Sequence, residues 1–245
     1  STEKNREYKK KNIIVMEDIT HRLLTEKNNS GLADYYIASL RKWFPIPSGG
    51  LAVKQNGSFK EIPLLSPPHT IIKKKNSAMI KKREYMSDIT LKEKSGFLSL
   101  FAEFNNDIRN NYKSLLIDDL SYKIISETNI TQLKHKRKEN VKFIYTNLKA
   151  AKGITFLINE SDYHNDCLLF VPIMVKHALR EQLRKHLISK SIYCPIHWPV
   201  PSLILSKELN SNLYENELSL ICDQRYGLSD MNKIIETIGE FQSNL

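Results

Sequence analysis

Two charged residues near the start of the chain follow apolar runs and are spaced so that they could share one edge of a sheet. Asp18 follows the apolar run 13–16, which we predict to be a buried parallel strand. Lys42 follows a second run at 35–40. Ligands of open α/β sheets bind at the carboxyl edge, so the spacing predicts one site for both side chains. A carboxylate that keeps a pyridine nitrogen protonated and a lysine amine that forms a Schiff base are what pyridoxal phosphate chemistry needs.

The segments around these two residues resemble the cofactor-binding core of fold-type I pyridoxal-phosphate enzymes, above all the DegT/StrS family of sugar aminotransferases. The resemblance rests on EDITH at 17–21, ASLRKW at 38–43 and PSGG at 47–50. Two later segments, 187–199 and 218–238, are similar to the family's small C-terminal domain. The resemblance implies an α/β fold that comprises part of the large domain, with its mixed, mainly parallel sheet, and a small C-terminal α/β domain. We place these two parts at residues 1–126 and 127–245, with the interdomain helix in the second part.

The resemblance also implies roles for single residues. Lys42 would be the Schiff-base lysine and the base that moves a proton, and Asp18 would hold the pyridine nitrogen. His21 would lie beside the cofactor ring, while Ser39 and Arg41 would help to hold the phosphate. Taken singly, a strand-end aspartate is often a turn former and a lysine often a surface residue, so the cofactor site depends on the whole set.

The C-terminal part adds two candidate substrate residues, His197 and Arg225. A structural role for His197, at a strand end before Trp-Pro, is an equal alternative. Two departures from the family stand out: Ser39 lies three residues before Lys42 instead of five, and only residues 1–11 precede the first strand. The family's phosphate-binding turn and its ring-stacking aromatic residue lie upstream of that strand. We therefore expect the chain to correspond to the C-terminal two thirds of such an enzyme.

The function that the resemblance implies is transfer of an amino group from an amino-acid donor to a keto sugar, expected to be nucleotide-linked, in amino-sugar or surface polysaccharide biosynthesis. Two alternatives stay open: a non-catalytic fragment or remnant of the fold that serves as a binding or assembly module, and a pyridoxal-phosphate-dependent lyase. The family also implies a homodimer. An aromatic stripe between residues 97 and 115 supplies apolar surface for a core or a subunit interface.

Composition fits a folded protein without a membrane span. The chain has 245 residues, of which 26% are charged and 41% hydrophobic, and no apolar run is long enough to cross a bilayer. With no secretory signal in view, we expect a cytoplasmic protein. The three cysteines are odd in number and lack metal-ligand spacing, which predicts reduced core residues and no metal site. The net charge of +10 is spread over separate lysine runs, which favours solvated faces over a specific nucleic-acid surface.

Periodicity and turn residues predict the remaining elements. Residues 2–12 read as a helix, 28–31 as a turn, and 50–54 and 59–65 as strands of one hairpin. Further helices are expected at 78–89, 91–116, 118–126, 130–149, 177–189, 206–216 and from 229 onward. Further strands are expected at 154–158, 168–175, 192–198 and 218–222.

Overall fold

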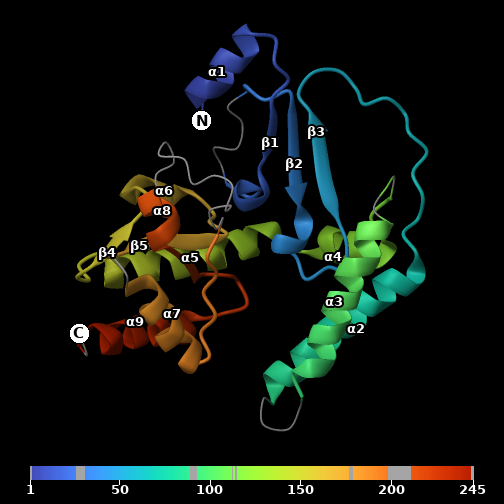
Figure 1. Cartoon of the computed structure of the whole chain (residues 1–245). Helices are drawn as coiled ribbons and strands as arrows, with labels where there is room; N and C mark the ends of the chain where they lie inside the picture. The colour runs from blue at the N-terminus through green and yellow to red at the C-terminus, as the bar shows by residue number, and fades with distance from the viewer. Residues whose placement is uncertain are drawn as a thin grey trace. The chain divides into compact units, whose positions relative to one another are not determined.

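The computed structural model describes residues 2–25, 31–88, 93–111, 113, 115–176, 179–197 and 211–243. The chain divides into two compact units, which we describe separately. The first unit is Ser1–Thr20 with Asn29–Thr128, and the second is His21–Asn28 with Asn129–Leu245. Each unit combines helices with a three-stranded sheet, which confirms the predicted α/β class (Figure 1). The assignment of the units to the family's large and small domains stays a prediction.

The sheet of the first unit is mixed and has the order β1-β2-β3 (Figure 1). Its strands are β1 (Met16–Asp18), β2 (Tyr35–Ser39) and β3 (Gly50–Lys54). β1 runs parallel to β2, as predicted, with Asp18 opposite Ile37. β3 runs antiparallel to β2, with Ser39 opposite Gly50. The carboxyl ends of β1 and β2 therefore lie side by side.

The apolar run before Asp18 is not the buried strand that we predicted. Val15 is buried, but Ile14 is 73% exposed and the strand begins only at Met16, itself 60% exposed. Within the described residues β1 is an edge strand that pairs with β2 alone. The apolar run 13–16, whose composition is typical of a strand buried on both faces, is therefore only partly covered. The predicted strand 59–65 is also wrong, because within the described parts of the chain this segment pairs only through a single bridge from Leu65 to Leu115.

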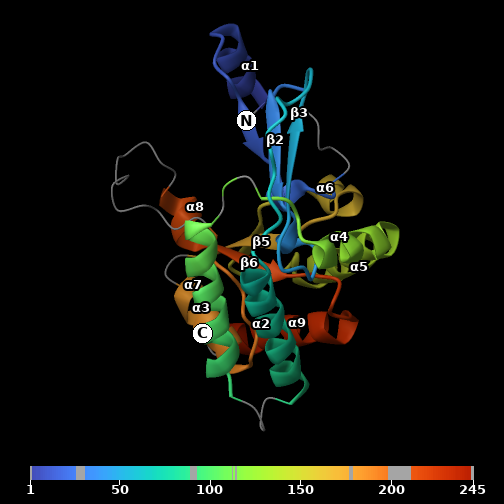
Figure 2. The ribbon, with the colours of Figure 1, turned by 90° about the vertical axis from the view of Figure 1, so that its right-hand side faces the viewer.

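Helices complete the first unit: α1 (Thr2–Lys10), α2 (His69–Ser87), α3 (Ser95–Asn110) and α4 (Asp119–Glu127). Helices α2 and α3 pack side by side, as both ribbon views show (Figure 1, Figure 2). α2 begins nine residues earlier than predicted, directly after Pro68, whose fixed backbone suits a helix start. On α3, Phe97 and Phe104 are buried, and the Phe97 ring lies 5.4 Å from that of Tyr85 on α2.

A polar network fixes the loop that follows β2. Asp118 caps α4 by accepting from the Ser121 backbone N–H at 2.9 Å. The hydroxyls of Ser48 and Ser121 both donate to Asp118 Oδ2 at 2.5 Å. The neighbouring Gly49 has φ +134°, and a Cβ there would lie 3.1 Å from side-chain atoms of Ile46 and Ile117. Glycine is therefore needed at this turn for both its backbone angle and its lack of a side chain.

The second unit has an antiparallel sheet of order β4-β5-β6, formed by β4 (Ile154–Phe156), β5 (Phe170–Val175) and β6 (Glu217–Ile221). Its helices are α5 (Ile130–Leu148), α6 (Glu160–Asn165), α7 (Leu179–Ser189), α8 (Ser211–Asn216) and α9 (Leu228–Ser243). Val171 and Ile173 of β5 belong to a core shared with Ile144 of α5, Leu187 of α7 and Ile238 of α9. Most elements of this unit fall close to their predicted bounds.

Two details of the second unit differ from the prediction. Residues 192–197 form no strand, although Pro195 accepts a hydrogen bond from the Ser219 backbone N–H at 3.1 Å. The segment 192–197 thus touches β6 without running along it. The short helix α6 was not predicted. Residues 28–30, 177–178, 198 and 206–210, which belong to other predicted elements, lie outside the described residues.

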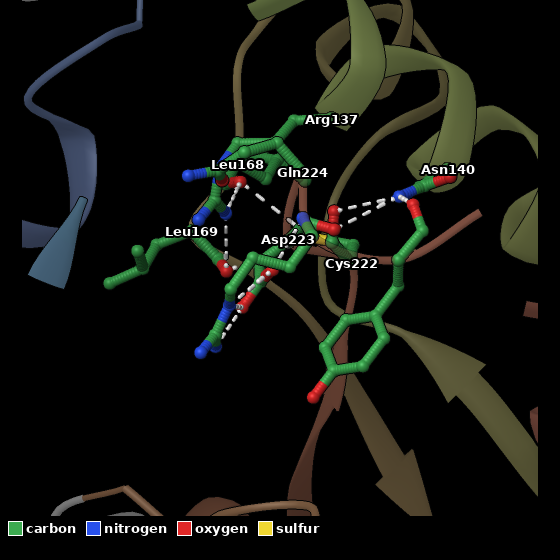
Figure 3. A network of polar contacts seen from close by, with 9 residues as sticks. Arg137, Asn140, Leu168, Leu169, Cys222, Asp223 and Gln224 are labelled. Atoms are coloured by element: carbon green, nitrogen blue, oxygen red, sulfur yellow. Dashed lines mark hydrogen bonds and ion pairs between the residues drawn. The ribbon is translucent and has the colours of Figure 1, made fainter. Parts of the chain in front are cut away.

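A buried arginine on α5 fixes that helix to the segments flanking β5 and β6 (Figure 3). Arg137 is 2% exposed, and its Nη1 donates to the carbonyls of Leu168 and Leu169, both at 3.1 Å. Its Nε donates to Gln224 Oε1 at 2.7 Å. One turn further on, the Asn140 amide donates to three backbone carbonyls of residues 222–226. These bonds give donors to backbone carbonyls of the segments that enter β5 and leave β6. Without them, these carbonyls would lack hydrogen-bond partners.

The three cysteines, Cys167, Cys194 and Cys222, are free and buried, as predicted. Burial raises the pKa of the Cys222 thiol to about 12, and those of Cys167 and Cys194 to about 11. No helix in the part of the chain that the structure describes combines the length and the apolar character of a bilayer span.

Candidate functional site

Thr20 joins the ends of the two parallel strands in the first unit. Its backbone N–H donates to Asp18 Oδ1 at 2.8 Å, so Asp18 closes a short turn at the end of β1. Its hydroxyl accepts from the Ser39 backbone N–H at 2.9 Å, at the end of β2. Its carbonyl accepts from the indole N–H of Trp43 at 2.6 Å, and Trp43 is 1% exposed. The chain segment that carries Lys42 is thereby held against the end of β1.

Asp18 has the role of a turn former, but with only one of its two oxygens. The residue is exposed, and Oδ1 accepts the Thr20 N–H. Among the described residues Oδ2 has no hydrogen-bond or ion-pair partner. A carboxylate oxygen at the carboxyl edge of the parallel pair is thus available to a ligand that carries a protonated nitrogen.

Arg41 and Lys42 end the short 3-10 helix η2 (Leu40–Lys42), which directly follows β2. Both side chains are exposed, and neither forms an ion pair with a described residue. The two cations stand beside the exposed end of the strand pair, so they favour an anionic ligand there.

A third cation, Lys75 of α2, was missed by the sequence analysis. Its Nζ lies 4.4 Å from the centre of the Phe101 ring and 4.7 Å from that of Phe104. Burial, and then the charges of Arg41, Lys82 and Lys42, lower the pKa of the Lys75 amine to about 8. Arg41 and Lys42 therefore act on Lys75 through their charges, which the run of three lysines at 73–75 could not have indicated.

His21 and His197, from distant parts of the sequence, meet in the second unit. Their ring centres are 4.9 Å apart in an edge-to-face arrangement, and the Phe170 ring lies 4.7 Å from that of His197. The rings line a cavity of about 480 Å³. Its other lining residues are Arg22, Thr25, Leu157, Ile158, Asp166, Leu168, Leu169, Pro172, Leu213, Tyr214, Glu217 and Ser219.

A carboxylate and a hydroxyl lie behind the His197 ring. His197 Nδ1 is 2.9 Å from the Ser219 hydroxyl, which donates to Glu217 Oε1 at 2.5 Å. The other Glu217 oxygen accepts from the His197 backbone N–H at 3.2 Å. Glu217 and Ser219 are buried, 8% and 3% exposed. No motif or spacing indicates this chain of bonds, because its members are side chains of β6 and of an irregular segment.

Arg225 is placed elsewhere. Its guanidinium forms an ion pair with Asp223 in the turn after β6, and this contact raises the pKa of Arg225. It does not belong to the residues that line the cavity of His197. The predicted site residues therefore form two groups: Asp18, Ser39, Arg41 and Lys42 in the first unit, and His21 with His197 in the second.

No protein-family model matches the sequence, and the search of curated proteins found no match. Solved structures do match. Helicobacter pylori PseC, an aminotransferase involved in the biosynthesis of pseudoaminic acid, is 16% identical with a TM-score of 0.62 over 100% of this chain and 64% of its own. A DegT DnrJ EryC1 StrS aminotransferase from Brucella abortus is 13% identical, with a TM-score of 0.58 over 97% of this chain and 59% of its own.

A third match is the sugar aminotransferase Spr1654 from Streptococcus pneumoniae in its PMP-form, which is 15% identical with a TM-score of 0.58 over 95% of this chain and 59% of its own. The chain thus spans about three fifths of the length of the structures that it matches. At these identities the similarity establishes the fold, which is that of sugar aminotransferases of the DegT/StrS type, as the sequence motifs predicted.

Proposed function

We propose that this chain carries the lysine-bearing part of a pyridoxal-phosphate-dependent aminotransferase that moves an amino group from an amino-acid donor to a keto sugar. The observation that carries the proposal is the pairing of strand ends in the first unit. Asp18 ends β1, Lys42 follows β2, the two strands are parallel, and Thr20 joins their ends. In a parallel sheet this edge is where ligands bind.

The residues fit the cofactor chemically. Bound pyridoxal phosphate would supply an electron sink for the α-carbon of the donor. Asp18 would keep a proton on the pyridine nitrogen through the oxygen that has no described partner. Lys42 would hold the cofactor covalently and then move the proton from the donor's α-carbon. Arg41 and Ser39 would hold the phosphate, and the positive charge of Arg41 suits that role.

The neighbouring structures support the reaction class. Spr1654 is described in both a PLP-form and a PMP-form. PseC is an aminotransferase involved in the biosynthesis of pseudoaminic acid. A DesI structure was obtained in the presence of its TDP-sugar product. By similarity of fold we infer a keto sugar linked to a nucleotide as acceptor. His21, His197 and Arg225 remain candidates for binding cofactor or substrate, although Arg225 would first have to leave Asp223.

The test is covalent trapping. The chain is incubated with pyridoxal phosphate, reduced with borohydride and digested, and the modified peptide is identified by mass spectrometry. We expect this chain alone to bind the cofactor weakly, with a faint visible absorbance band at excess cofactor before reduction and a single adduct on Lys42. Lys42→Ala should abolish both, while Lys75→Ala, the matched control on α2, should retain them. Adduct on Lys75 or on scattered lysines would refute the assignment, and a non-catalytic binding or assembly module would take its place.

We also propose a homodimer. The aromatic stripe offers less apolar surface for an interface than its sequence suggested, because part of it is buried within the first unit. Phe97 and Phe104 of the aromatic stripe are buried within the first unit, whereas Leu98 is 48% exposed. Tyr112 lies outside the described residues. Sedimentation at micromolar concentration is expected to give a dimer, and a monomer alone would contradict the proposal.

A further inference from the structure

Two neighbouring lysines of α2 meet α3 in different surroundings. The two helices pack side by side (Figure 2). Lys74 Nζ forms ion pairs with Asp107 at 2.6 Å and with Glu103 at 3.2 Å, both on α3. Lys75 forms no ion pair or hydrogen bond with a residue that the structure describes, and its Nζ lies over two phenylalanine rings of α3. Of these two amines, only that of Lys74 has a carboxylate to compensate its charge.

The rings do not replace a counter-ion for Lys75. An aromatic face attracts an ammonium, but it carries no net charge, so its attraction is weaker than that of a carboxylate. The side chain is also half-buried, which removes part of the hydration that an ammonium has in water. Half-burial without a counter-ion favours the neutral amine, which is the nucleophilic form of lysine.

The charges that act on Lys75 from the described part of the chain are positive. They are those of Arg41, Lys82 and Lys42, and all four residues belong to the first unit. Lys82 follows Lys75 by seven residues on α2, which places both on one face of the helix. Burial and these three charges lower the pKa of the Lys75 amine to about 8. The same three charges would stabilise a negative group at this position.

We propose that Lys75 binds carbon dioxide as a carbamate. The unprotonated amine attacks the carbon of carbon dioxide, an N–C bond forms while one C=O π bond opens onto its oxygen, and the nitrogen releases one proton to water. The product, Lys75–NH–COO⁻, is an anion among Arg41, Lys42 and Lys82. A neutral amine supplies the nucleophile and cationic surroundings stabilise the product. Lys74, held by two carboxylates, meets neither requirement.

The test traps the carbamate on the unaltered chain. The protein is equilibrated with isotope-labelled carbon dioxide and bicarbonate in a closed vessel at about pH 7.5, without pyridoxal phosphate. Triethyloxonium tetrafluoroborate then converts a carbamate into a stable ethyl ester, and mass spectrometry of the digested protein locates the label. The α-amino group of the tested chain, whose ordinary pKa is about 8, shows that trapping has worked.

The two neighbouring lysines should differ strongly in the amount of adduct. At about pH 7.5 roughly a quarter of the Lys75 amines are unprotonated, against about a thousandth for a lysine with its ordinary pKa. Because a less basic amine also binds carbon dioxide less strongly, we take only part of this ratio. We expect the adduct on Lys75 to exceed that on Lys74 by roughly ten-fold or more.

Variants test the contribution of the cationic surroundings. Lys75→Arg keeps the positive charge and should remove the adduct at this position. Arg41→Gln and Lys82→Gln each remove one cation and should lower the Lys75 adduct by roughly two-fold, the size expected for one partly screened charge. Lys81→Gln is the matched control, because Lys81 is an exposed neighbour on α2 that is not among the charges acting on Lys75.

An adduct on the α-amino group without one on Lys75, or equal adducts on Lys75 and Lys74, would overturn the carbamate site. An adduct that stays at the wild-type amount in both Arg41→Gln and Lys82→Gln would overturn the role of the cations. The trapped residue is not Lys42 and no pyridoxal phosphate is present. Carbamate trapping and cofactor trapping therefore fail or succeed independently.

Discussion

Replacing Thr20 by valine tests whether this residue holds the two strand ends together. Valine has nearly the shape of threonine and keeps the backbone bonds to Asp18 and Trp43, so only the hydroxyl bond to the Ser39 N–H is lost. Leaving a buried donor without its acceptor costs about 1–3 kcal/mol. Because Ser39 is only half-buried, we take the lower part of that range, about 1–2 kcal/mol.

Hydrogen exchange at the Ser39 amide measures this loss at the bond itself. A cost of that size corresponds to exchange roughly 5- to 30-fold faster when the amide exchanges by local opening. Thr155→Val, at an exposed threonine on β4, is the matched control and should leave the Ser39 amide unchanged. If the Ser39 amide exchanged at the wild-type rate in Thr20→Val, Thr20 would not be the link between the strand ends. The structural basis for placing Lys42 near Asp18 would then fail.

Three further measurements follow. Because the pKa of Lys75 is lowered from 10.5 to about 8, the unfolded chain binds more protons between these values, so this residue makes the free energy of unfolding rise with pH across that window. Methylated-lysine NMR should show Lys75 titrating near 8, and Lys74, whose pKa the Asp107 carboxylate raises, titrating above its ordinary value. The three buried thiols should resist iodoacetamide at pH 8 until the protein unfolds, and early labelling would contradict their burial. Arg137→Met should lower the free energy of unfolding by about 3 kcal/mol, since it leaves the buried carbonyls of Leu168 and Leu169 without a donor. Lys136→Met, on the half-exposed face of α5, should have little effect.

Local signals predicted the parts of the fold that local interactions determine. α5 and α9 follow from helical periodicity. In the structure Asn129 also caps α5, accepting from the Gln132 N–H at 2.9 Å. The parallel pairing of β1 and β2 followed from two apolar runs with charged residues at their ends. The errors fall where pairing with other segments decides whether a run of residues becomes a strand. Residues 13–16 and 59–65 have strand composition, but a strand exists only where a partner pairs with it.

The candidate site could be predicted only as far as its motifs extend. Asp18 and Lys42 lie in short segments whose order along the chain already implies a common edge. Thr20 was part of the same motif, yet its role as a link depends on three bonds that no spacing reveals. Glu217 and Ser219 alternate along β6, as side chains on one face of a strand do, but nothing in the sequence indicates that His197 faces them.

The choice between Lys42 and Lys75 as the cofactor lysine depends on which residue meets the other requirements of the chemistry. With a pKa of about 8, Lys75 would have about a tenth of its amine unprotonated at pH 7, so it would react readily with a simple aldehyde. Its amine, however, lies over the rings of Phe101 and Phe104 of α3, whereas Lys42 ends the 3-10 helix that follows β2, the strand paired with β1. Pyridoxal phosphate needs a carboxylate at its ring nitrogen as well as an amine at its aldehyde. The position of Asp18 therefore favours Lys42 as the cofactor lysine. Selection by the reactivity of the amine alone would point to Lys75.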